Sequence, residues 1–252
     1  MPTLLFSLFL SVFLYVRMAM PTGPGDFSSV VAALVGNQGS SALAADNFEA
    51  SGTLVNSAGV TSSFTLTCQK TLFRFERRVG GDTLTTLRRD RRSQTTRNGK
   101  LGNPVESPRS LSAMNLLPVF ALVSFRDDPR FTGSVIETEG GMTGLRFIEG
   151  TPPGMKPPPF PQPKLSVTIG LDAAGRIESA TYTQDRGTAP RVTYRYSYDT
   201  FVPGDPSLPG KVSCTAGSNL LWTATLSGTR KNIPIPVDFF QIVETHERIK
   251  KQ

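Results

Sequence analysis

Histidine and cysteine are almost absent from this chain, and their scarcity removes most of the common catalytic and metal-binding arrangements. The 252 residues include one histidine, His246, and two cysteines, Cys68 and Cys214. A Ser-His-Asp or Cys-His nucleophile would have to use His246, and neither a four-cysteine zinc site nor a histidine-rich metal site can be built. The P-loop, nucleophile-elbow and HExxH patterns do not occur either. The sequence therefore indicates no metal and no other cofactor, and it predicts a protein that is not an enzyme.

One pair of carboxylates keeps a catalytic alternative open. Glu137 and Glu139 would share one face of a strand, roughly 7 Å apart by the rise of a β-strand. Two carboxylates at such a separation could serve glycoside hydrolysis. Any two alternate residues on an exposed strand reach the same spacing, so the pair by itself does not indicate a hydrolase.

The first 20 residues form a segment that resembles a secretory signal. Residues 1–16 carry no charge and are mostly apolar, and a run of this length is short of the roughly 20 residues that span a bilayer. No lysine or arginine precedes the run and Arg17 follows it, so an uncleaved segment that anchors the protein is the alternative. We expect an exported, periplasmic protein with a linker at 21–27. In that compartment Cys68 and Cys214 could form a disulfide, the alternative being two free buried thiols.

Polar and apolar residues alternate with period two along most of the remaining chain. About ten such segments, joined by short glycine-rich turns such as 80–82, indicate antiparallel strands. Two stretches at helical spacing, 28–45 and 118–126, interrupt the pattern, and seven prolines within 151–163 predict an extended loop. The fold class is therefore mainly β, of the α+β type. We expect a single curved antiparallel sheet, an incomplete barrel, with helices covering its concave face.

Four motifs in this order resemble those of the outer-membrane lipoprotein carriers, the LolA-like and LolB-like superfamily. They are Phe48-Glu-Ala-Ser-Gly-Thr-Leu54, Phe73-Arg-Phe-Glu-Arg77, Tyr196-Ser-Tyr-Asp-Thr-Phe-Val-Pro-Gly204 with the following Leu208-Pro-Gly-Lys-Val212, and Ile233-Pro-Ile-Pro-Val-Asp-Phe-Phe240. They frame a domain at 28–242, which leaves a charged tail at 243–252. The resemblance implies an envelope protein that holds an acyl chain, a lipid or a lipidated protein in the concave face of its sheet.

Apolar residues on the inward face of the predicted sheet are the candidates for ligand binding. A pocket for such a ligand is largely apolar with a few polar groups. Apolar stripes of period two more often fill a core, so a packed interior without a cavity is the alternative. The candidate cavity residues are Phe64, Leu66, Phe73, Phe75, Phe120, Leu145, Phe147, Val167, Ile169 and Trp222.

Positive charge is concentrated in one part of the chain. The net charge is +7, and residues 70–100 alone hold ten lysines or arginines against three acidic residues. The densest stretch contains Arg88, Arg89, Arg91 and Arg92, which we expect to face an anionic membrane surface. A second functional hypothesis follows, an interaction or sensor module with a filled core that acts through this arginine-rich surface. Nucleic acid is not an expected partner of an exported protein, and the sequence leaves the oligomeric state open.

Overall fold

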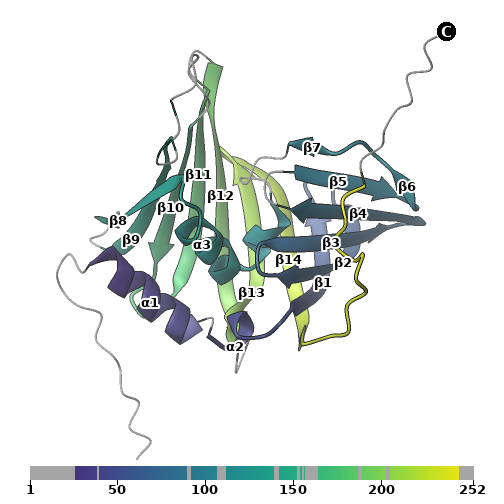
Figure 1. Ribbon diagram of the computed structural model, residues 1–252, viewed down its shortest axis with the longest axis horizontal. Helices are drawn as coiled ribbons and strands as arrows, with labels where there is room; N and C mark the ends of the chain where they lie inside the picture. Colours follow the sequence, from purple (N-terminus) through teal and green to yellow (C-terminus); the bar gives the residue numbers. More distant parts are fainter. Residues whose placement is uncertain are drawn as a thin grey trace, which may run out of the picture.

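One antiparallel sheet forms the body of the protein (Figure 1). The computed structural model describes residues 26–38, 40–89, 92–106, 112–138, 142–151, 154, 156, 164–186, 189–202 and 205–243. Fourteen strands lie in this part of the chain, where about ten were expected, and two of the additional strands have only two residues each. The strands are β1 Phe48–Asn56, β2 Thr61–Gln69, β3 Leu72–Val79, β4 Asp82–Arg89, β5 Arg92–Arg97, β6 Lys100–Leu101, β7 Val105–Glu106, β8 Phe131–Glu137, β9 Thr143–Glu149, β10 Lys164–Leu171, β11 Ile177–Arg186, β12 Ala189–Val202, β13 Asp205–Ala216 and β14 Asn219–Lys231.

The order of the strands confirms the predicted incomplete barrel. The sheet runs β6-β5-β4-β3-β2-β1-β14-β13-β12-β11-β10-β9-β8, and β7 pairs with β5. Because β6 and β8 lie at opposite ends of this order, the sheet is curved but not closed. One long-range pairing, β1 with β14, joins the strands from the first part of the chain to those from the last part. Elsewhere in the sheet order, neighbouring strands follow one another in the sequence, as expected for a series of hairpins.

The helices cover only part of the concave face. They are α1 (Phe27–Gln38), α2 (Ser40–Leu43), the 3₁₀ turn η2 (Ala113–Leu116) and α3 (Pro118–Arg126). The first stretch at helical spacing, 28–45, contains both α1 and α2. Pro118 occupies the first turn of α3, where its missing N–H costs nothing. Helices α1 and α3 pack against β8 and β13, and α3 also packs against β11. The concave face is therefore covered by α-helices mainly between β8 and β13 (Figure 1).

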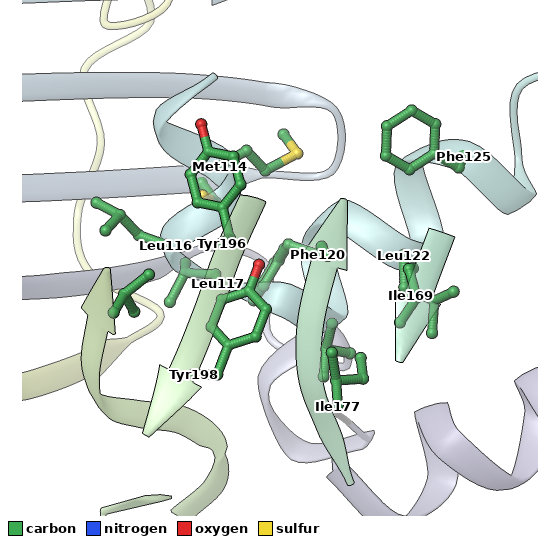
Figure 2. Close-up of a cluster of buried hydrophobic side chains, with 14 of the residues drawn as sticks. Met114, Leu116, Leu117, Phe120, Leu122, Phe125, Ile169, Ile177, Tyr196 and Tyr198 are labelled. Atoms are coloured by element: carbon green, nitrogen blue, oxygen red, sulfur yellow. The ribbon is translucent and has the colours of Figure 1, made fainter. Parts of the chain in front are cut away.

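Beneath α3 the interior is filled with side chains. The Phe125 ring lies 5.0 Å from Phe131, 5.8 Å from Phe147 and 5.9 Å from Tyr182, measured between ring centroids. Figure 2 shows Leu122 of α3 beside Ile169 of β10, within the same buried cluster. This half of the concave face is a close-packed core.

Asn115 fixes η2 to the sheet. Its side-chain Oδ1 accepts a hydrogen bond from the Tyr182 hydroxyl at 2.7 Å, and its backbone carbonyl accepts one from Tyr198 at 2.9 Å. All three residues are buried, so these bonds satisfy hydroxyl groups that would otherwise be costly to enclose. The 3₁₀ turn is thereby held above β11 and β12, at the border between the two halves of the concave face.

The last described residues, 232–243, form a strap that crosses β3 to β5 (Figure 1). The side chain of Asn47 exchanges two hydrogen bonds with the backbone of Ile233. The buried side chain of Gln94 does the same with Val243, at 2.8 and 2.9 Å. Between these points the guanidinium of Arg74 lies 4.7 Å from the centre of the Phe239 ring. The strap thus covers the face opposite to the helices, a role that the pattern at Ile233–Phe240 did not reveal.

Candidate functional site

The ten residues that the sequence proposed for a cavity divide into two environments. Leu145, Phe147, Val167 and Ile169 are at most 2 % exposed and lie on β9 and β10, under the helices. Phe147, for example, meets the rings of both Phe27 and Phe125. Here the alternative of a filled core holds, because the helices supply side chains that occupy the space. Phe64, Leu66 and Phe120 are also buried in this core.

An open pocket lies over the other half of the concave face. Its volume is about 270 Å³. Strands β3, β4 and β5 form its base, η2 and the preceding residue contribute from above, and β1 and β14 add one residue each. Only three of the ten proposed residues line it, namely Phe73, Phe75 and Trp222. The complete lining is Leu54, Phe73, Phe75, Arg77, Leu84, Thr86, Ser93, Thr95, Ser112, Ala113, Leu116 and Trp222.

The pocket exists because the α-helices stop short of these strands. Alternation places Phe73, Phe75 and Arg77 on the concave side of β3, with Leu84 and Thr86 beside them on β4. Phe75 and Trp222 are only half-buried, unlike the fully enclosed aromatic residues beneath α3. An accessible apolar surface of this kind, enclosed on several sides, is what a ligand site requires.

The lining is amphipathic. Apolar side chains are accompanied by four hydroxyl groups, and the hydroxyls of Thr86 and Thr95 lie 3.2 Å apart on neighbouring strands. Arg77 is the charged residue of the lining, and the sequence analysis did not single it out. Period two in Phe73-Arg-Phe-Glu-Arg77 already places Arg77 on the same face as the two phenylalanines, although a search for apolar pocket residues does not select a charged one.

The predicted arginine surface is wrong for Arg88. This side chain is 4 % exposed and lines a second, smaller cavity of about 50 Å³ together with Ser112 and Asn115. Strand alternation turns Arg88 to the concave side, in register with Phe73 and Ser93, and turns Arg89 to the opposite side. Arg89 and Arg92 are exposed register partners in the β4–β5 hairpin, whereas Arg91 lies outside the described residues.

Of the two alternatives for the cysteines, the structure has the free buried thiols and not the disulfide. Cys68 on β2 and Cys214 on β13 are both free and buried. Two strands, β1 and β14, separate β2 from β13, so a spacing of about 4.8 Å per strand keeps the cysteines on the order of 14 Å apart or more. A disulfide needs Cα atoms within about 7 Å. Burial instead raises the pKa of Cys68 to about 12 and that of Cys214 to about 11.

We expect both thiols to be unreactive in the folded protein. At pH 8 almost none of either cysteine is thiolate, because burial disfavours the charged form, and the thiolate is the nucleophile. An aromatic disulfide reagent should therefore detect no thiol in the native protein. After unfolding in denaturant without reductant, it should detect two thiols per chain. If the reagent detects no thiol in the unfolded chain, the two cysteines form a disulfide and the expectation of free thiols is wrong.

The structure describes only one member of the carboxylate pair, so a glycoside-hydrolysing pair at these positions stays a prediction. Glu137 is the last residue of β8, and Glu139 lies outside the described residues. In the described ranges, histidine, cysteine, aspartate and glutamate side chains form no group of three or more that could hold a metal ion. The described helices include none with the length and apolar character needed to cross a membrane.

Comparison with known proteins reveals a shared fold without sequence similarity. No protein-family model matches the chain, and no curated protein sequence matches it. A LolA superfamily protein from Nitrosomonas europaea superposes with a TM-score of 0.53 at 10 % identity, covering 86 % of this chain and 97 % of the other. A DUF1329 family protein from Desulfovibrio piger superposes with a TM-score of 0.51 at 9 % identity, covering 85 % and 97 %. The protein therefore has the LolA-like fold that its motifs resemble.

Proposed function

We propose that this protein is a non-catalytic envelope protein that binds an acyl chain, a lipid or a lipidated protein in the pocket over β3 to β5. The observation that carries the proposal is the open pocket of about 270 Å³, lined by Phe73, Phe75 and Trp222 on the half of the sheet that α1 and α3 leave uncovered. The fold supports this proposal, and the signal-like segment at 1–20 supports a periplasmic or anchored location.

The size and lining of the pocket favour a slender apolar group. Ligand pockets commonly measure about 300–1,000 Å³, so this one lies near the lower limit. An aliphatic chain could contact Phe75, Leu84 and Leu116 while its other end reaches the hydroxyl groups of β4 and β5. Burial of such a chain contributes about 0.8 kcal/mol per methylene group, so even a short chain would bind measurably.

Native mass spectrometry tests the proposal directly. The chain would be exported from a bacterial host with its own N-terminal segment, purified without detergent and measured before and after extraction with organic solvent. We expect a stoichiometric acyl-containing molecule that the extraction removes. An empty protein that takes up no added lipid would contradict the proposal and direct the search to the exposed Arg89 and Arg92.

A charge placed in the pocket should abolish this binding. Phe75→Glu and, separately, Trp222→Glu each replace an apolar side chain of the lining with a carboxylate, which should weaken acyl binding by about 100-fold or more. A carboxylate that stays unpaired is costly to bury under an acyl chain, and one that pairs with Arg77 of the same lining occupies the pocket itself. The matched control is Ile148→Glu, because Ile148 is 48 % exposed on β9 and lies outside the pocket. Binding that survives in both folded pocket variants would show that the ligand lies elsewhere.

A further inference from the structure

Arg77 gives the pocket a charge preference. Resting on the proposed function, we propose that the ligand is a single-chain fatty carboxylate whose head group pairs with the guanidinium of Arg77. This proposal names one class of ligand within the broader group of acyl chains, lipids and lipidated proteins. It also predicts which pocket residue distinguishes an acid from a neutral molecule of the same length.

The position of Arg77 is set by the register of the sheet. On β3 it lies opposite Phe64 of β2 and Leu84 of β4, and Phe75 precedes it on the same face. Its side chain is half-buried and lines the pocket. A cation surrounded by apolar side chains loses part of its hydration, and a bound anion would restore that loss.

The acidic residues around Arg77 are already engaged by other cations. Arg74 and Arg78, on the opposite face of the same strand, lie 3.5 and 3.4 Å from the carboxylate of Glu76. Asp82, at the β3–β4 turn, pairs with Arg97 and accepts a hydrogen bond from Asn98 at 2.7 Å. Within the part of the chain that the structure describes, Arg77 has no carboxylate at ion-pairing distance. The pocket therefore presents a positive charge that a ligand can neutralise.

Charge and volume together indicate one chain with one negative charge. One guanidinium forms a two-pronged pair with one carboxylate, whereas a phosphate dianion would need more cationic groups than the lining supplies. A volume of about 270 Å³, near the lower limit for ligand pockets, suits one chain better than a molecule with several.

Trp222 makes the test direct. It is the single tryptophan of the chain and it lines the pocket, so its fluorescence reports occupancy. The full chain would be titrated with decanoate and with decanol, each below its aggregation concentration. We expect both to bind, and we expect Arg77→Leu to weaken decanoate about ten-fold while leaving decanol unchanged, as loss of a charge-assisted hydrogen-bonded pair predicts. Arg77→Lys should retain part of the preference, because it keeps the charge and loses the paired geometry.

The matched control is Arg78→Leu, which removes the same charge from the next position, on the opposite face of β3. It should leave both affinities unchanged. If decanoate and decanol bind equally and Arg77→Leu affects neither, or weakens both alike, the carboxylate assignment is overturned while acyl binding in the pocket stands. If neither ligand binds the wild-type protein, the proposed function itself fails.

Discussion

Replacing Gly52 with alanine should unfold most of the protein at room temperature or prevent its folding. A Cβ atom at this position would lie 2.1 Å from the carbonyl oxygen of Thr225 and 3.0 Å from the Cα of Leu226. Both are backbone atoms of β14, so no side-chain rotation can make room. Gly52 also lies at the register shift between β1 and β14, the pairing that joins the two parts of the sheet. Separating these strands would cost about 4 kcal/mol or more, a large part of the stability of an ordinary domain.

Urea unfolding monitored by circular dichroism measures this effect. The matched control is Gly36→Ala in α1, where a Cβ atom would meet nothing within 4 Å. Alanine is preferred to glycine in a helix, so the control should increase the free energy of unfolding by about 0.5–1 kcal/mol. A Gly52→Ala protein that unfolds at the same urea concentration as the wild type would show that β1 and β14 are not packed as closely as described.

Phe125→Ala should be the most damaging of the simple core truncations. Its ring is 1 % exposed and lies among Phe131, Phe147 and Tyr182, beneath α3. Removing a fully buried phenylalanine side chain from a close-packed core costs about 3–5 kcal/mol, since the surrounding side chains collapse only partly into the space. The cost should appear as a lower free energy of unfolding with little change in the m-value.

Truncating a phenylalanine of the pocket, Phe75, distinguishes the open pocket from the close-packed core. Phe75 is half-buried beside open space, so Phe75→Ala should cost about half as much stability or less, while it weakens acyl binding. Phe125→Ala should leave binding intact at a temperature where it is folded. Equal stability losses for the two variants would mean that the pocket is closed in solution and that the whole concave face is a filled core.

Local patterns in the sequence determined the elements and their inward faces. Alternation at Phe73 and Phe75 predicted the concave side of β3, and the glycines at 80 and 81 predicted the hairpin to β4, because pleat and turn geometry depend on adjacent residues. Pro118 marked the start of α3 for the same reason. The mainly β class, the curved unclosed sheet and its helical cover followed from these elements and from the family resemblance.

Only the tertiary structure decided which inward-facing residues meet packing partners and which meet open space. Period two assigns Phe147 and Phe75 alike to the concave face, yet α3 covers the first and stops before the second. For the same reason the sequence did not predict that Arg77 lines the pocket or that Arg88 is buried. It also did not predict that Cys68 and Cys214 lie too far apart for a disulfide. Each of these outcomes depends on where a distant segment lies, such as α3 above the sheet or β14 beside β1. Alternation along one strand carries no information about a neighbour that is 100 or more residues away in the chain, as Thr225 is from Gly52.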